Sequence, residues 1–238
     1  MALRRPRAID TTTRDAFGRK LRAWYRRNAR DLPWRRTRDS YEVLVSELML
    51  QQTQVSRVMT RYGEFLERFP TLGDVARAKP ARVMEAWSGL GYYARARNLH
   101  RLAREVTDGG RAPERQLPAD PAALRALPGI GAYTAGAVAS FAYLRRAALV
   151  DTNVARVLKR VFAPSANLKT SKGQRHVWQI AESILPRTGS ATWTHNQALM
   201  ELGALVCTAR VAHCARCPVR GLCRSAPTFK KLRTGTPT

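Results

Sequence analysis

The stretch LPGIGAYTAG, residues 127–136, decides how this chain folds. Pro128 ends a helix, while Gly129 and Gly131 can adopt a positive φ and let another backbone come close. Short helical patterns precede and follow the turn, so we predict two helices joined by a tight hairpin. The second helix would start with unpaired N–H groups, which form a site for a phosphate. An ordinary glycine-containing connection between helices is the structural alternative.

Working outward from this hairpin, the rest of the chain also has a helical pattern. Apolar residues recur at spacings of three and four, and no alternating β-branched run is long enough to predict a sheet. Asp120 is the expected N-cap of the helix before the hairpin. We therefore predict an all-α fold. The expected helices cover residues 15–27, 40–69 (one or two helices), 71–78, 81–87, 94–107, 121–126, 132–143, 153–162, 173–185 and 196–206.

The charge of the chain indicates a polyanionic partner. The 238 residues include 42 Lys and Arg against 17 Asp and Glu, a formal net charge of +25. Such an excess favours nucleic acid as the partner, whereas arginine-rich codon usage alone would not deplete acidic residues. No apolar run approaches the roughly 18 residues that span a bilayer, and no signal peptide is visible. We expect a cytoplasmic protein, associated with the nucleoid through DNA, with no membrane partner.

All four cysteines lie within 17 residues, spaced Cys207-x6-Cys214-x2-Cys217-x5-Cys223. A disulfide framework would distribute its cysteines along a small secreted chain, so clustered thiols indicate metal ligands. Thiolates at close spacing could hold zinc or an iron–sulfur cluster. Common zinc modules use two C-x2-C pairs, and only one is present here.

Three further motifs accompany the hairpin and the cysteine spacing: SELMLQQTQV (46–55), WSGLGYYARARNL (87–99) and LVDTNVARV (149–157). Together these motifs, from about residue 31 to residue 223, resemble the MutY branch of the helix-hairpin-helix DNA glycosylases. The resemblance implies a two-lobed fold, with the flipped base held in the cleft between the lobes. One lobe is a six-helix barrel at 35–146 that includes the hairpin. The other combines 1–34 with 147–225 and carries a [4Fe–4S] cluster, and 226–238 is a basic tail.

The resemblance also assigns catalytic roles. Asp151 would stabilise positive charge on the sugar, Asn153 would orient nearby groups, and Glu47 would protonate N7 of adenine. We expect Glu47, in an apolar helix, to lose solvent and hold its proton more tightly. Related enzymes that cut the strand have a lysine at position 133 for a Schiff base. Tyr133 cannot form one, which indicates base removal without strand cleavage. The structural alternatives are an N-cap for Asp151, a solvated face for Glu47 and core packing for Tyr133.

Five further residues are expected to form the base pocket: Trp34, Arg35, Leu50, Val55 and Gln197. Val55 and Gln197 match the adenine type of pocket, whereas related thymine glycosylases have a smaller and an apolar residue there. Gln197 can both donate to and accept from an adenine edge. Core packing is the alternative for Leu50 and Val55.

The expected DNA contacts come from three segments. Gln52 and Tyr92 would enter the double helix beside the orphaned partner base, because a base must be flipped out before chemistry can reach it. Arg95 and Arg97 would bind phosphates, and Gly129 and Gly131 would approach the backbone at the hairpin. A structural aromatic turn is the alternative for Tyr92.

The sequence thus predicts a monomeric, monofunctional DNA glycosylase that excises mispaired adenine, opposite 8-oxoguanine or guanine, from double-stranded DNA. A glycosylase for thymine, uracil or hypoxanthine and a non-catalytic DNA-binding protein are the alternatives. Full-length members of the branch continue into a domain that recognises 8-oxoguanine. This chain ends 15 residues after Cys223, so we expect no such domain in it. The preferred opposite base is therefore open.

Overall fold

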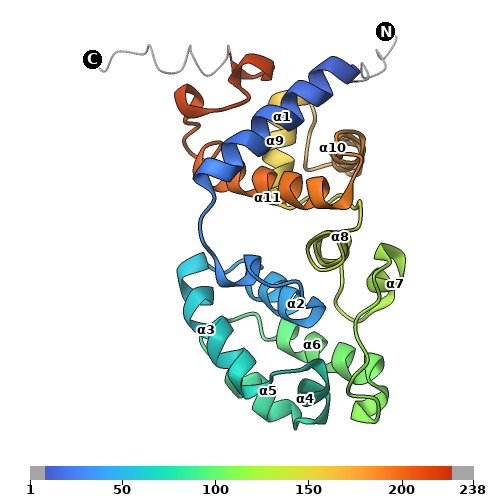
Figure 1. Ribbon diagram of the computed structural model, residues 1–238. Helices are drawn as coiled ribbons and strands as arrows, with labels where there is room; N and C mark the ends of the chain where they lie inside the picture. The colour runs from blue at the N-terminus through green and yellow to red at the C-terminus, as the bar shows by residue number, and fades with distance from the viewer. Residues whose placement is uncertain (1–8, 227–238) are drawn as a thin grey trace, which may run out of the picture. The chain divides into compact units, whose positions relative to one another are not determined.

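A computed structural model describes residues 9–226, and within this range the fold is all-α, as predicted (Figure 1). The described residues contain no β-strand beyond a single bridge between Cys207 and Ala212. The chain divides into two compact units. The middle unit is Arg30–Ala147, and the flanking unit is formed by residues 9–29 and 148–226. None of the described helices is long and apolar enough to cross a membrane. Of the expected basic tail, residues 227–238 lie outside the described range.

Two buried helices lie at the centre of the middle unit. α2 (Ser40–Met49) packs against α8 (Ala132–Phe141), and nearly every residue of both is buried. A helix that is apolar on all sides belongs in a core, which explains why neither has a solvated face. The other helices of the unit are α3 (Val55–Arg68), α4 (Leu72–Arg77), α5 (Pro80–Ala86), α6 (Ala94–Val106) and α7 (Pro121–Ala126), with 3-10 turns at Pro33–Arg35 and Asp108–Gly110. Of these helices, α3 and α6 pack on α2, and α7 packs on α8.

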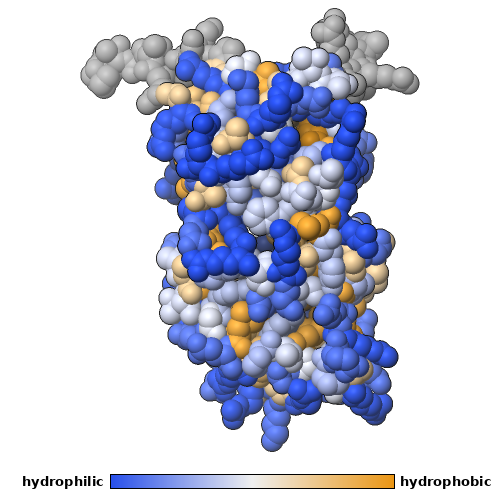
Figure 2. All heavy atoms as spheres, viewed as in Figure 1, coloured by the Kyte–Doolittle hydropathy of each residue, from blue (hydrophilic) through white to orange (hydrophobic). Residues whose placement is uncertain are grey.

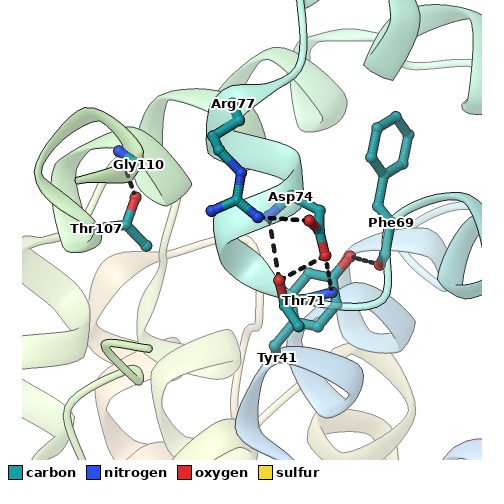
Figure 3. A network of polar contacts seen from close by, with 7 residues as sticks. All are labelled: Tyr41, Phe69, Thr71, Asp74, Arg77, Thr107 and Gly110. Carbon is teal, nitrogen blue, oxygen red and sulfur yellow. Dashed lines mark hydrogen bonds and ion pairs between the residues drawn. The ribbon is translucent and has the colours of Figure 1, made fainter. Parts of the chain in front are cut away.

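A polar network joins α2 to the connection between α3 and α4 (Figure 3). The Tyr41 hydroxyl donates to the carbonyl of Phe69 at 2.6 Å, and its burial raises the pKa of Tyr41 far above the ordinary value. Thr71 and Asp74 cap the start of α4 reciprocally. Arg77 pairs with Asp74 at 2.7 Å. These contacts satisfy polar groups at a helix start that packs closely on the core.

The flanking unit consists of α1 (Thr11–Asn28), α9 (Thr152–Phe162), α10 (Ser171–Ser183) and α11 (Gly189–Leu205). α11 packs against α1 and α9, and α9 also packs against α10 (Figure 1). Phe17 of α1 meets Phe162 of α9 edge-on, with 4.9 Å between the ring centroids. Two 3-10 turns follow, at Cys214–Arg216 and Arg220–Leu222. Figure 2 shows hydrophilic side chains over much of the visible surface of both units, consistent with the high positive charge.

The largest difference from the predicted helices is the start of α11. It begins at Gly189 instead of Asn196, and Thr188 caps it by accepting from the N–H of Ala191 at 3.3 Å. Glycine, serine and threonine in residues 189–194 are weak helix formers, so local pattern alone did not reveal this turn. Packing against α1 outweighs that weak propensity. Residues 40–69 form two helices, separated by a turn in which Gln52 has a φ of 54°.

Candidate active site and nucleic-acid interface

The two central helices bring Glu47 and Tyr133 together. Glu47, on α2, is only 4% exposed, and the Tyr133 hydroxyl on α8 donates to its Oε2 at 2.6 Å. Tyr133 lies in the first turn of α8, directly after the hairpin. A buried carboxyl group in an apolar helix is costly unless polar groups surround it, so the contact is a specific arrangement rather than a surface pairing. The expected solvated alternative for Glu47 is therefore excluded.

Of the two hairpin glycines, only Gly129 has a positive φ, whereas Gly131 has a φ of −87°. Gly129 has a φ of 77°, and a Cβ at this position would lie 2.6 Å from Cβ of Asn98 on α6. Gly131 is the N-cap residue of α8, and no described side chain caps that helix. Both glycines are exposed. The start of α8 thus has no side-chain cap, as is typical of helix starts that bind phosphate.

The predicted wedge residues are exposed and have unusual backbones. Gln52 lies between α2 and α3 with a φ of 54°, and Tyr92 lies between α5 and α6 with a φ of 47°. Tyr92 is 60% exposed. Non-glycine residues in the left-handed region are uncommon and cluster where function requires a strained shape.

The predicted phosphate contacts differ from each other in burial. Arg97 is exposed on α6, as a phosphate contact requires. Arg95 is only 7% exposed, and its guanidinium group is surrounded by backbone carbonyl groups. The expectation that Arg95 binds a phosphate does not fit this location, because the donors that would meet DNA already have partners inside the protein. Arg95 and Arg97 lie on different faces of α6, so one is buried and the other is exposed. The sequence alone did not show which face of this helix packs on the protein.

The predicted base-pocket residues lie in both units. Trp34, Arg35, Leu50 and Val55 belong to the middle unit, whereas Gln197 is on α11 of the flanking unit. Trp34 is buried edge-on against Tyr62, with 5.6 Å between the ring centroids. Arg35 donates to the carbonyl of Arg30 at 3.0 Å. Leu50, at the end of α2, and Val55, at the start of α3, are half-buried. Gln197 is 5% exposed.

Asp151 caps α9, so the structural alternative for this residue holds. Its Oδ1 accepts from the N–H of Val154 at 2.6 Å, and its Oδ2 accepts from the Asn153 side chain at 3.1 Å. Asn153 Oδ1 in turn accepts from Arg156 at 2.7 Å. Arg156 also donates to the carbonyl of Cys207 at 2.9 Å. The Asp151 carboxylate remains half-exposed, so capping does not remove it from a ligand's reach.

The four cysteines line one cavity of the flanking unit together with apolar side chains of α9 and α11, among them Val157 and Leu202. Arg160 donates to Cys207 Sγ at 3.3 Å and to the carbonyl of Thr208 at 2.7 Å. Burial raises the pKa of the Cys217 thiol to about 11, and the other three cysteines add to this rise. No described group of three or more Cys, His, Asp or Glu residues has the arrangement of a single-ion site.

Sequence reasoning missed Arg156 and Arg160. Both lie on α9 one turn apart, and both donate to the segment that begins at Cys207. Their spacing of four was readable from the sequence. Their partners were not, because those are backbone carbonyl groups about 50 residues away in the chain.

These features define a helical protein in which a glycine-containing hairpin leads directly into the helix that contacts a buried carboxyl group. The chain belongs to the HhH-GPD superfamily of base excision DNA repair proteins, whose family description matches residues 45–183.

Within that superfamily the chain is similar to curated adenine DNA glycosylases. It is 43% identical to that of Rattus norvegicus over 88% of this chain and 42% of the relative. For Mycolicibacterium smegmatis the values are 45%, 84% and 66%, and for Mycobacterium tuberculosis 41%, 90% and 69%. The chain thus spans less than half the length of the rat protein.

Two solved structures are similar in fold. A thermostable thymine-DNA glycosylase superposes with a TM-score of 0.81 at 28% identity, covering 91% of this chain and 98% of that chain. A trapped endonuclease III–DNA covalent intermediate gives 0.76 at 23% identity, covering 94% of this chain and 100% of that chain. At that identity the second likeness concerns the fold alone.

Proposed function

We propose that this chain is a monofunctional DNA glycosylase that flips out mispaired adenine, opposite 8-oxoguanine or guanine, and removes it by hydrolysis. The hydrogen bond between Tyr133 and Glu47 carries the proposal. It holds a buried carboxyl group in one orientation, at the start of the helix that follows the hairpin. The likeness to adenine DNA glycosylases supports the choice of base.

Glu47 is the proposed general acid. It transfers a proton to N7 of adenine, so that the base leaves with the electron pair of its bond to C1′ of the sugar. Tyr133 is the positioning group for this carboxyl, because its hydroxyl donates to Oε2. With tyrosine instead of lysine at position 133, no Schiff base forms with the sugar, and the strand stays intact after base removal.

Asp151 is the proposed electrostatic partner of the sugar. Loss of the base leaves positive charge on the ring, which a fixed carboxylate stabilises until water adds to C1′ and releases a proton to solvent. Two hydrogen bonds, from the N–H of Val154 and from Asn153, hold this carboxylate in place. Arg156 fixes Asn153 in turn. The carboxylate is therefore oriented before the substrate arrives, so little reorganisation is needed during the reaction.

The base pocket and the DNA contacts complete the proposal. Gln197 would recognise the adenine edge, with Trp34, Arg35, Leu50 and Val55 as pocket residues in the middle unit. Arg97 and the hairpin at Gly129 and Gly131 would bind phosphates, and Gln52 with Tyr92 would fill the space that the flipped base leaves. The net charge of +25 supports tight, salt-dependent binding to the DNA backbone.

We also propose a [4Fe–4S] cluster held by Cys207, Cys214, Cys217 and Cys223. The four thiols line one cavity with apolar walls, and the donor to Cys207 Sγ is the cation Arg160. Common zinc modules use two C-x2-C pairs, whereas this chain has only one, and this spacing favours a cluster over zinc. Such a group would supply structural support to the loop of residues 207–223.

Metal content tests this assignment. The purified protein should contain about four irons and about four acid-labile sulfides per chain, and Cys217→Ser should lower both. A content of one zinc and no sulfide per chain would show that the cysteines bind zinc instead of a cluster.

Base release under single-turnover conditions tests the function. The substrates are duplexes that each contain one A·8-oxoguanine, A·G, G·T, G·U or hypoxanthine pair, treated afterwards with or without hot alkali. We expect adenine release, with strand cutting only after alkali. Thymine or uracil release would favour the second candidate, which the likeness to a thymine-DNA glycosylase supports. Binding of a duplex without release of any base would indicate a DNA-binding protein that has no catalytic activity.

A further inference from the structure

Arg95 is a buried cation without an acidic partner. It is 7% exposed, and no described ion pair joins it to a carboxylate. Burial lowers the pKa of its guanidinium group from the ordinary value. Taking such a charge out of water is costly unless its donors are all satisfied. Here neutral oxygen atoms satisfy them: the carbonyls of Leu48, Met49, Gln51, Leu90 and Gly91 at 2.5–3.0 Å, and Thr53 Oγ1 at 3.3 Å.

The acceptors come from two separate loops. One terminus of the planar guanidinium, Nη1, binds the end of α2 and the loop that contains Gln52. The other, Nη2, binds the loop before Tyr92. The same group also lies over the ring of Tyr92, with Cζ 5.4 Å from its centroid. A flat fork of five donors can bridge two loops in this way, whereas an ammonium group cannot.

Each of the two loops that Arg95 joins carries an exposed residue with a left-handed backbone. Gln52 has a φ of 54° and Tyr92 a φ of 47°. Such conformations persist only where the surrounding structure enforces them. Thr53 reinforces the link by donating to the carbonyl of Leu90 at 3.4 Å, and Arg57 donates to that of Gly89 at 3.4 Å.

We propose that Arg95 is the positioning residue that fixes Gln52 and Tyr92 as a single rigid wedge for opening DNA. This inference deepens the proposed function and rests on it. Arg95 itself touches neither the base nor the phosphates, since its donors point into the protein. Its contribution is to hold both wedge residues in the conformation that enters the duplex. Contacts with this preformed surface then offset the free energy of unstacking the bases.

The test separates base opening from base removal. Arg95→Lys retains the charge but cannot bridge both loops, and Arg95→Met retains most of the apolar stem. Arg104→Met is the matched control, because Arg104 is exposed on the same helix and has no assigned role. Single-turnover adenine release is measured on a duplex with an A·G pair. It is also measured on the same duplex with an abasic site opposite the adenine, where the target is already unpaired.

We expect both Arg95 variants to slow release from the A·G duplex by about 10- to 100-fold, as small misplacements of a reacting geometry do. On the abasic-site duplex the loss should shrink to about threefold or less, because less opening is needed. 2-Aminopurine beside the mismatch should show reduced unstacking on binding. Arg104→Met should match the unsubstituted protein in each assay.

Equal losses on both duplexes, with unstacking unchanged, would overturn the inference and leave Arg95 a residue of general structural importance. Should Arg95→Met not fold, Thr53→Val removes one bridging hydroxyl at small cost and is expected to show a weaker form of the same substrate dependence. Absence of adenine release by the unsubstituted protein would instead contradict the proposed function. The 2-aminopurine signal would then still report whether Arg95 controls unstacking.

Discussion

At the scale of single residues, Asp151 combines a structural role and a proposed catalytic role that substitution can separate. Asparagine caps a helix about as well as aspartate, but it has no charge. Asp151→Asn should therefore keep the stability and DNA binding of the protein while base release falls by about 100-fold or more. Thermal unfolding, binding to an A·G duplex and single-turnover release check this. Full release by the variant would show that the carboxylate has no part in the chemistry.

Asp151→Ala provides the comparison for the capping role. It removes both the charge and the acceptor for the N–H of Val154. We expect a loss of about 1 kcal/mol in the free energy of unfolding, in addition to the loss of base release. Equal stability of the alanine and asparagine variants would mean that this cap contributes nothing to folding.

Glu47 and Tyr133 allow the acid and its positioning group to be told apart. Glu47→Gln should lower base release by about 100- to 10,000-fold, because an amide cannot donate the proton. Tyr133→Phe removes the hydroxyl that donates to Glu47 Oε2 at 2.6 Å and should lower release by about 10- to 100-fold. A pH–rate profile checks the assignment. In the pH–rate profile of Tyr133→Phe, one limb should be shifted along the pH axis. An unshifted profile would mean that the hydroxyl contributes only to packing.

At the scale of structural elements, the hairpin depends on its two glycines in different ways. Gly129→Ala places a Cβ 2.6 Å from Asn98 Cβ at a φ of 77°, so we expect lower stability, by about 1–3 kcal/mol, and weaker DNA binding. Gly131 has a φ of −87° and no atom within 4 Å of a built Cβ. Gly131→Ala should therefore leave the unfolding temperature nearly unchanged. Similar destabilisation by both substitutions would contradict this assignment.

Helix α11 makes the flanking unit sensitive to acid. His195 is fully buried against Phe17, and burial, together with Arg22, lowers its pKa to about 3. Between pH 6.5 and 3 the unfolded state therefore binds a proton that the folded state does not. Stability should fall as the pH drops through this window, by up to about 1.4 kcal/mol per unit. Denaturant unfolding of His195→Leu should show a shallower pH dependence; an unchanged slope would assign the acid sensitivity to other groups.

The sequence predicted the helices and the hairpin because their signals are local: apolar spacing, Pro128, and the glycines. It did not predict the early start of α11, where packing overrides weak helix formers. It also misplaced Arg95, since an arginine in a basic helix looks like a DNA contact until its exposure is known. The positions of Glu47 and Tyr133 came from motifs, but their hydrogen bond joins residues 86 apart and depends on how α2 and α8 pack.

At the scale of the whole molecule, the excess of cations governs affinity for DNA. Each phosphate that a Lys or Arg neutralises releases counterions, so the logarithm of the binding constant should fall linearly with the logarithm of salt concentration. Arg97→Ala should reduce that slope by about 0.9, and binding isotherms at several salt concentrations measure it. If Arg97→Ala leaves the slope unchanged, Arg97 does not contact a phosphate of the DNA.

The left-handed backbones at Gln52 and Tyr92 bear on how quickly such a protein can search. Contacts of Arg95 within the protein hold both loops, so we expect no loop rearrangement at each base pair that the protein meets. Nearly all pairs in a genome are undamaged, and the time spent on each one determines how long a full survey takes. Because the wedge residues need no rearrangement, the rate at which a base pair opens spontaneously would determine the rate of detection. Weak pairs would then be detected first simply because they open more often.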